Sequence, residues 1–463
     1  MILRGSLLLC FVVWSHGESR AANGPADTLQ VLRLLKEARQ PSNNSILGFV
    51  HDSALSMRAL ELAERIGWER GRFKGHLWSL LSISDRDLRA DPNVWAMHVR
   101  GATQRRAWAS TEELVLLYRT LGRANAFFQI ADTAALYIDS AQWAAERSGD
   151  ERLLALTAYT RAHSLRIAER WADAFRMALK ANAMAEQLDD PLLKASGYNL
   201  SGMIRGRLGD LQGAVQDFTA SLVLADSMGI HAVRLRNHNN WAFVMEVKGH
   251  WREALEQYRA LYDVTTTTGQ EMEYLPQVET GIGYMLVRLD SLDQGEAVLG
   301  RLWNTKAMVG DPYESWFNNA WALLQLRRGR YREAVTSAHT AFITEQLDEN
   351  DVVKRDASRI LSEAYKALKR PVEALEWTEV AHQWEDSVLY RQQANDALRE
   401  EMDREMAVRA AQDSLVHAAE TARVERANQE RASEEKARRN ALLIGGIAIL
   451  LIAFQLKGLL LPA

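Results

Sequence analysis

Cysteine and proline are scarce in this chain of 463 residues. The one cysteine, Cys10, lies close to the N-terminus, so the rest of the chain has no disulfide and no thiol chemistry. Eight prolines and no alternating apolar pattern indicate a chain built from helices rather than strands. The formal net charge of −4 is small for this length and implies no nucleic-acid partner.

The short motifs of common catalytic sites are also missing. The sequence contains no HExxH, GxSxG, GxxxxGKS or paired CxxC, so nothing in it supports an enzyme. Its histidines are scattered, which indicates surface or inter-helix packing rather than metal ligation: His163, His231, His238, His250, His339 and His382. We therefore expect a protein that is not an enzyme and that needs no metal ion and no cofactor.

What the sequence does contain is a small residue about every 40 positions. The spacings are 40, 40, 40, 41, 39 and 40, for Ala134, Ala174, Ala214, Ala254, Gly295, Ala334 and Ala374. Small or apolar residues follow mostly at offsets of four and seven, which places them on one helix face. A period kept over seven copies predicts one helical unit stacked into a solenoid, in which each unit buries its apolar face against its neighbours.

A tight turn precedes each small residue. Five positions before it, the clearest copies have Gly209, Gly249 and Gly329, and glycine adopts φ > 0 without penalty and so ends a helix. In the other copies the same place is taken by Gln129, Glu169, Asp290 and Lys369. Three positions before it, the next helix is predicted to start, at Ala131, Trp171, Leu211, Trp251, Leu292, Tyr331 and Pro371. The unit is therefore predicted to be a helical hairpin.

The best copies resemble the tetratricopeptide repeat (TPR). They run from Gly209 to Phe218, from Gly249 to Tyr258 and from Gly329 to Ala338, and they show glycine, an apolar or aromatic residue two later and alanine three after that. The resemblance covers roughly residues 110 to 385 and implies an all-α, TPR-like, right-handed solenoid. HEAT and armadillo repeats remain an alternative, although they lack the run of glycine, aromatic and alanine.

The ends of the chain differ from this array. Arg4, an apolar run and a small-residue cleavage site predict a signal peptide over residues 1–22. Residues 23–110 are predicted to form degenerate helical repeats, including a helix over 54–66, and residues 111–384 the repeat array. Residues 385–440 are predicted to be a charged helical stalk, either a weak coiled coil in a homodimer or a single solvated helix. Residues 441–461 are predicted to be a transmembrane helix, with a buried or interfacial helix as the alternative.

This order of parts is similar to the sensory half of membrane receptors of Bacteroidetes-type bacteria. In those receptors the span is followed by a histidine kinase, a cyclase or a DNA-binding domain, none of which follows here. The resemblance implies an exported input module in the bacterial inner membrane, crossing the bilayer once, with its repeats in the periplasm. The alternative is a membrane-bound assembly or chaperone factor for secreted or outer-membrane proteins.

In TPR arrays the first helix of each unit lines a concave groove that binds peptides or partner helices. Asparagine suits an extended backbone, arginine suits carboxylates and aromatic side chains suit apolar anchors. The resemblance gives these candidate groove residues: Tyr159, His163, Arg166, Asn199, Met203, Arg207, Arg236, Asn239, Asn240, Phe243, Tyr284, Arg288, Trp316, Asn319 and Arg327. They do not reproduce the Lys/Asn clamp of chaperone-binding TPR proteins. The alternative is that they are ordinary polar positions without a ligand.

Overall fold

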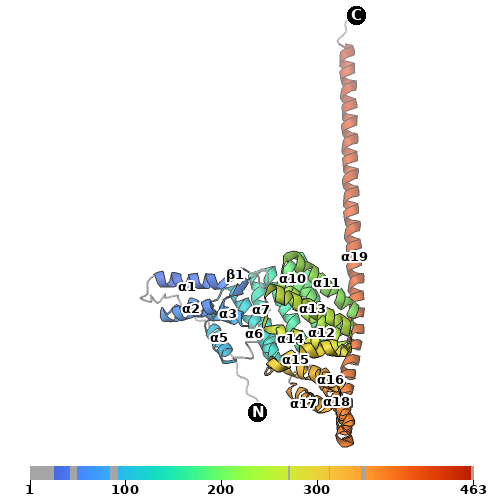
Figure 1. Cartoon of the computed structure of the whole chain (residues 1–463). Coiled ribbons are helices and arrows are strands. Elements are labelled where there is room, and N and C mark those ends of the chain that lie inside the picture. Colours follow the sequence, from blue (N-terminus) through green and yellow to red (C-terminus); the bar gives the residue numbers. More distant parts are fainter. Residues whose placement is uncertain are drawn as a thin grey trace, which may run out of the picture. The chain divides into compact units, whose positions relative to one another are not determined.

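The computed structural model describes residues 25–41, 49–83, 92–269, 272–311, 313–345 and 351–459. Nearly all of these residues are helical (Figure 1). The predicted signal peptide, residues 1–22, lies outside the described residues. The chain divides into two compact units, Met1–Asp396 and Ala397–Ala463.

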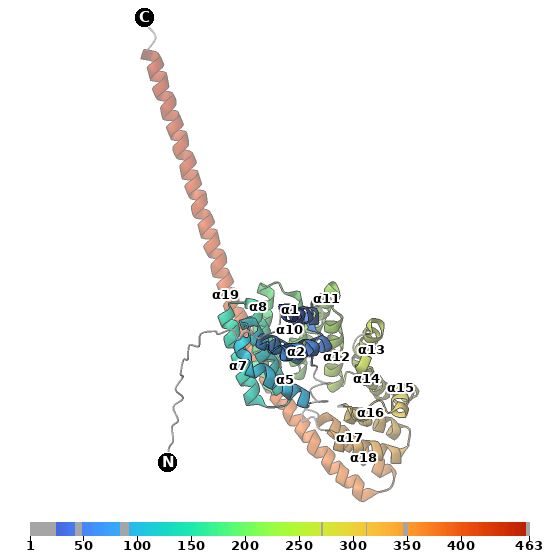
Figure 2. The same cartoon turned by 90° about the vertical axis from the view of Figure 1, so that its left-hand side faces the viewer.

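Seven helical hairpins follow one another in the described part of the first unit (Figure 2). Their first helices are α6 (Thr111–Phe127), α8 (Glu151–Ile167), α10 (Pro191–Arg207), α12 (His231–Val247), α14 (Leu275–Arg288), α16 (Glu314–Arg327) and α18 (Asp351–Ala367). Their second helices are α7 (Ala131–Ser148), α9 (Trp171–Gln187), α11 (Leu211–Met228), α13 (Trp251–Thr268), α15 (Leu292–Thr305), α17 (Tyr331–Thr344) and α19 (Pro371–Leu459). A short 3-10 helix, η2 (Met272–Tyr274), precedes α14.

The predicted turn is confirmed in every hairpin of this array. The turn residue has a positive φ in all seven, including the four copies without glycine, where φ is 58° at Gln129, 54° at Glu169, 62° at Asp290 and 57° at Lys369. Each second helix starts at the predicted residue, from Ala131 in α7 to Pro371 in α19. A degenerate turn sequence has therefore kept the left-handed conformation that glycine adopts most easily.

The recurring small residues are buried where the two helices of a hairpin meet. Ala174, Ala214, Ala254 and Ala334 have no exposed surface. At Gly295 an added Cβ would lie 2.7 Å from Cγ2 of Val287, closer than carbon atoms pack. The 40-residue period thus marks the positions where the backbones come closest together, as the sequence predicts.

The described residues before the array form four helices and one small sheet. The helices are α1 (Pro25–Ala38), α2 (Ser53–Arg65), α3 (Glu69–Ser82) and α5 (Pro92–Gln104), followed by the 3-10 helix η1 (Arg106–Trp108). The predicted helix over 54–66 corresponds to α2. Strands β1 (Arg39–Pro41) and β2 (Phe49–His51) pair antiparallel, with Gln40 opposite Val50. No pattern in the sequence predicted these strands, because three residues per strand are too few to show an alternation of apolar and polar residues.

The predicted position in a membrane is wrong. In the part of the chain that the structure describes, no helix is at once long enough and apolar enough to cross a bilayer. The apolar run begins at Ala441 and is interrupted by Gln455, and Lys436, Arg438 and Arg439 lie just before it. A run of fourteen residues is shorter than the roughly 20 that a bilayer requires. The prediction of a single-pass inner-membrane protein with periplasmic repeats is corrected accordingly.

Helix α19 is continuous through the predicted boundaries at residues 384 and 440. Its first part belongs to the repeat unit, which it contacts a second time far from the seventh hairpin. The guanidinium of Arg391 lies 3.7 Å from the carboxylate of Glu169, and the amide of Asn395 donates to the carbonyl of Arg207 at 3.4 Å. Residues 391–395 of α19 therefore lie beside hairpins α8–α9 and α10–α11.

Candidate functional site

The candidate groove residues all lie on first helices, namely α8, α10, α12, α14 and α16. Two cavities collect most of them. The larger cavity is lined by Arg236, Asn239, Phe243, Tyr284, Arg288, Trp316 and Asn319. The smaller cavity is lined by Arg166, Met203, Arg207 and, again, Phe243. The candidates predicted from the repeat pattern thus come from five hairpins, and most of them line one of these two cavities.

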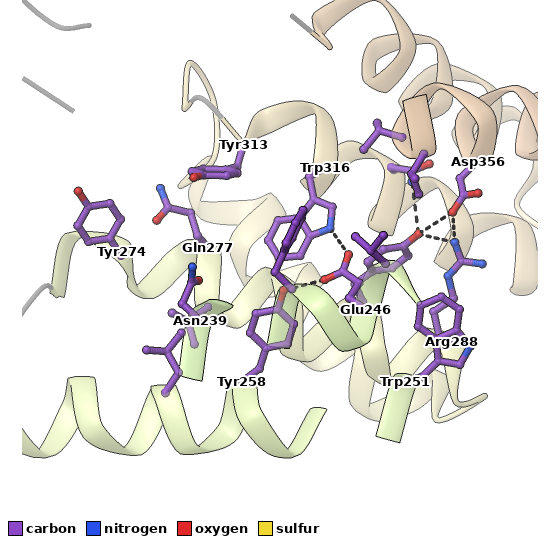
Figure 3. Close-up of a pocket in the computed structure, with 18 of the residues that line it drawn as sticks. Asn239, Glu246, Trp251, Tyr258, Tyr274, Gln277, Arg288, Tyr313, Trp316 and Asp356 are labelled. Carbon is purple, nitrogen blue, oxygen red and sulfur yellow. Dashed lines mark hydrogen bonds and ion pairs between the residues drawn. The ribbon is translucent and has the colours of Figure 1, made fainter. Parts of the chain in front are cut away.

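The larger cavity has a volume of about 540 Å³. Helices α12, α13, α14, α16 and α18 supply most of its wall, and α6 contributes Arg123. Figure 3 shows Tyr274, Gln277 and Tyr313 toward one end and Trp251, Arg288 and Asp356 toward the other. Trp316 and Glu246 lie between the two ends. A cavity of this size admits several residues of an extended peptide or a small molecule.

Glu246, on α12, ties three helices of the wall together. Its carboxyl accepts hydrogen bonds from the hydroxyl of Tyr258 at 2.7 Å and from the indole nitrogen of Trp316 at 2.8 Å. Burial raises the pKa of Glu246 to about 7, although both hydrogen bonds and the charge of Arg288 act in the opposite direction. The carboxyl is therefore partly protonated near neutral pH.

A second buried carboxyl, Asp356, joins α18 to α14. It forms ion pairs with Arg288 and, at 2.6 Å, with Arg355. The hydroxyl of Tyr284 lies 3.2 Å from the Asp356 carboxylate and accepts a hydrogen bond from Arg288 at 2.5 Å. The guanidinium of Arg288 also lies over the ring of Trp251, 5.1 Å from its centre. Three side chains from three helices, Arg355, Tyr284 and Trp251, thus surround the Asp356–Arg288 pair.

Asn319 carries a hydrogen-bond acceptor that has no partner within the described residues. Its side-chain nitrogen lies 3.4 Å from the hydroxyl of Tyr284. That hydroxyl has one proton, which it donates to Asp356, so the Asn319 atom facing it must be the amide nitrogen. The oxygen, Oδ1, is buried and unbonded, in a residue that is 1% exposed and lines the cavity. Such an atom favours a ligand that brings an N–H group.

The smaller cavity, about 40 Å³, lies between α8, α10 and α12. The guanidinium of Arg207 lies 5.5 Å from the ring centre of Trp171, which also lines this cavity. Phe243 and Val247 line both cavities, so the two are neighbours along the groove.

Five candidate residues line neither cavity. Asn240 donates to the side-chain oxygen of Asn199 at 2.8 Å, which links α12 to α10. Tyr159 packs against an apolar cluster of α6 to α10, and His163, on the same helix α8, is half-buried. Arg327 pairs with Asp290 at 3.6 Å, and both side chains are largely exposed. Arg327, the last residue of α16, therefore pairs with the turn of the preceding hairpin and lines neither cavity.

Several lining residues were not among the sequence candidates: Arg123, Glu246, Trp251, Tyr258, Arg355 and Asp356. Arg123 stands 40 positions before His163, so extending the projection by one repeat would have found it. Trp251 and Tyr258 occupy consensus positions of the repeat, which we expected only to pack. Among the described residues, no cluster of His, Cys, Asp or Glu is suited to hold a metal ion.

No family model and no curated protein matches this sequence. Among solved structures, the chain is similar to a Rap protein complexed with competence and sporulation factor, with a TM-score of 0.52 and 9% identity, over 79% of this chain and 99% of that one. It is also similar to the apo form of RapI, with a TM-score of 0.51 and 9% identity, over 78% and 98% of the two chains. At these identities the similarity concerns the fold, which is of the helical-repeat, TPR type.

Proposed function

We propose that this protein is an interaction module that binds an extended segment of a partner polypeptide in the larger cavity. The observation that carries the proposal is Asn319, a residue that lines a cavity of about 540 Å³ and whose buried Oδ1 has no partner among the described residues. A buried acceptor left unbonded costs about 1 to 3 kcal/mol. The backbone N–H of a peptide would satisfy it.

The composition of the wall favours the binding of one defined peptide rather than the binding of many different client proteins. Trp251 and Trp316 offer apolar surface, while Asn239 and Gln277 offer amides that donate and accept. An assembly or chaperone factor would need a groove that is mainly apolar. The similar Rap protein was crystallised in complex with competence and sporulation factor, which agrees with a binding role for a chain of this fold.

The proposed role is that of an input module, as the resemblance to receptor sensor halves implies. Helix α18 contributes Val353 and Asp356 to the cavity, and the next helix is α19, which extends over 89 residues. A ligand that changes the contacts of Asp356 would act on the hairpin from which α19 extends. Self-association through α19 stays a prediction.

The test is selection from a synthetic library of random heptapeptides. The full chain is immobilised, bound peptides are identified by mass spectrometry, and the dissociation constants of enriched peptides are measured by calorimetry. We expect Asn319→Ala to weaken these peptides about tenfold, the effect of losing one hydrogen bond to a buried group. Phe243→Ala should also weaken them, and its 45% exposed side chain can be removed with little effect on folding.

The matched control is Asn304→Ala, on an exposed face of α15 away from the cavity. It should bind the enriched peptides like the wild type. The proposal fails if no peptide is enriched, or if Asn319→Ala and Phe243→Ala both bind like Asn304→Ala while circular dichroism shows all three folded.

A further inference from the structure

The larger cavity carries an excess of positive charge. Its lining includes the guanidinium groups of Arg123, Arg236, Arg288 and Arg355, and the carboxyl groups of Glu246 and Asp356. Asp356 is already paired with two of these cations, Arg288 and Arg355. The negative charge of Asp356 is therefore already balanced by arginines of the wall.

Glu246 does not balance the charge of Arg236. Each of its oxygens accepts one hydrogen bond from the wall, from Tyr258 and from Trp316. Burial raises its pKa to about 7, so a neutral form is well populated at neutral pH.

Arg236 is the cation best placed to meet a ligand. It lies on α12, its side chain is exposed, and it makes no hydrogen bond or ion pair with another described residue. The positive charge of Arg236 also acts on a residue of α8, His163. Burial lowers the pKa of His163 well below its ordinary value, and the charges of Arg166, Arg123 and Arg236 lower it further. The groove beside the cavity is therefore electropositive.

We infer that the ligand is a peptide that carries a carboxylate, which pairs with Arg236 on α12 while a backbone N–H of the same peptide donates to Oδ1 of Asn319 on α16. This inference rests on the proposed function and adds the chemical class of the peptide. The carboxylate comes either from the C-terminus or from an aspartate or glutamate side chain.

There is a physical reason why one ligand should make both the contact with Arg236 and the contact with Asn319. A guanidinium binds a carboxylate through two parallel hydrogen bonds, and such charge-assisted bonds are about twice as strong as neutral ones. A neutral peptide would satisfy Asn319 and leave the positive charge unbalanced. The carboxylate is thus expected to improve affinity about tenfold or more, and the gain should shrink at high salt.

The experiment compares three heptapeptide pools on the full-length protein. The first pool lacks aspartate and glutamate and ends in an amide, so it has no carboxylate. The second differs only in its free C-terminal carboxylate. The third ends in an amide but includes aspartate and glutamate. We expect the second or the third pool to be retained at least tenfold more than the first, and the pool that prevails identifies the source of the carboxylate.

Arg236→Gln should abolish this preference, so that the three pools are retained to the same extent. The matched control is Arg259→Gln, an exposed arginine on α13 that does not line the cavity, and it should keep the preference. Equal retention of all three pools by the wild type, or an unchanged preference in Arg236→Gln, would overturn the carboxylate inference and leave the proposed function intact. If no pool binds, the proposed function itself fails.

Discussion

The groove has two stretches whose first helices follow the same 40-residue register and whose cavities differ in size. Along α8 and α10 the cavity measures about 40 Å³, whereas along α12 to α18 it measures about 540 Å³. Equivalent positions are occupied by His163, Met203 and Phe243, at a spacing of 40 residues. The hairpins are alike, so the difference comes from the side chains on their first helices.

Buried carboxyls account for much of that difference. In the second stretch Glu246 holds Trp316 and Tyr258, and Asp356 holds Arg288. These bonds hold the large side chains against the wall, so that space remains between them. In the first stretch Asn199 of α10 instead accepts a hydrogen bond from Asn240 of the next first helix, α12. An open cavity in a repeat array therefore depends on partners for its large polar side chains.

The largest expected effect comes from breaking the Asp356 pair. Asp356→Ala leaves the guanidinium of Arg288 without its buried partner, since the Asp356 side chain is 6% exposed. Removing one member of a buried ion pair destabilises a protein by about 3 to 5 kcal/mol. The free energy of unfolding is measured by urea titration with circular dichroism at 222 nm.

The matched control is Asp139→Ala, inside α7, which removes the partner of Arg161 at a pair whose carboxylate is largely exposed. Surface pairs contribute about 0 to 1 kcal/mol, so this variant should stay close to the wild type. Equal losses in the two variants would show that Asp356 has no special role in holding α18 to α14.

The second prediction uses pH to separate the two stretches. The pKa of Glu246 is about 7 in the folded protein, above its ordinary value of 4.5, so the folded state binds this proton more tightly than the unfolded state. Its contribution to stability is fully present below pH 4.5 and is lost as the pH rises through about 7. The loss is on the order of 3 kcal/mol and should be absent in Glu246→Gln. Urea titrations at pH 5 and pH 8 measure it.

His163, in the first stretch, should act with the opposite sign. Its pKa is lowered by burial and by neighbouring arginines, so its contribution to stability is present above pH 6.5 and is lost as the pH falls. His163→Gln should therefore flatten the acid side of the stability profile, and Glu246→Gln the neutral side. Profiles that change in the same direction would contradict the assignment of these two groups.

The framework of the fold was accessible from the sequence because it depends on short-range rules. The period of 40 located the helix starts from Ala131 to Pro371, and the turn was recognised even where Glu169 or Lys369 replaces glycine. The backbone of a short turn has few possible conformations when the two amphipathic helices that it joins must pack against each other. The two short strands β1 and β2 had no comparable signal.

The site was only partly accessible, for reasons that differ by residue. Phe243, Tyr284 and Asn319 follow from the repeat register on the first helices. Asp356 does not, because it stands 37 positions after Asn319 and the register shifts before α18. The carboxyl of Glu246 could be seen in the sequence, but its partners could not, because hydrogen bonds between helices depend on distances that the period does not specify.

The smallest of these effects compares two tyrosine–glutamate hydrogen bonds with the same sequence separation of 12 residues. Tyr258 donates to the buried Glu246 at 2.7 Å, and Tyr198 donates to the exposed Glu186 at 3.2 Å. Tyr258→Phe leaves a buried carboxyl oxygen without its donor, so we expect a loss of about 1 to 3 kcal/mol in the free energy of unfolding. Tyr198→Phe should cost less than about 0.5 kcal/mol, because water replaces the lost bond. Thermal or urea unfolding of both variants decides the matter. A similar small loss in both would mean that water reaches Glu246, and the cavity would then be open to solvent along the wall that this carboxyl holds together.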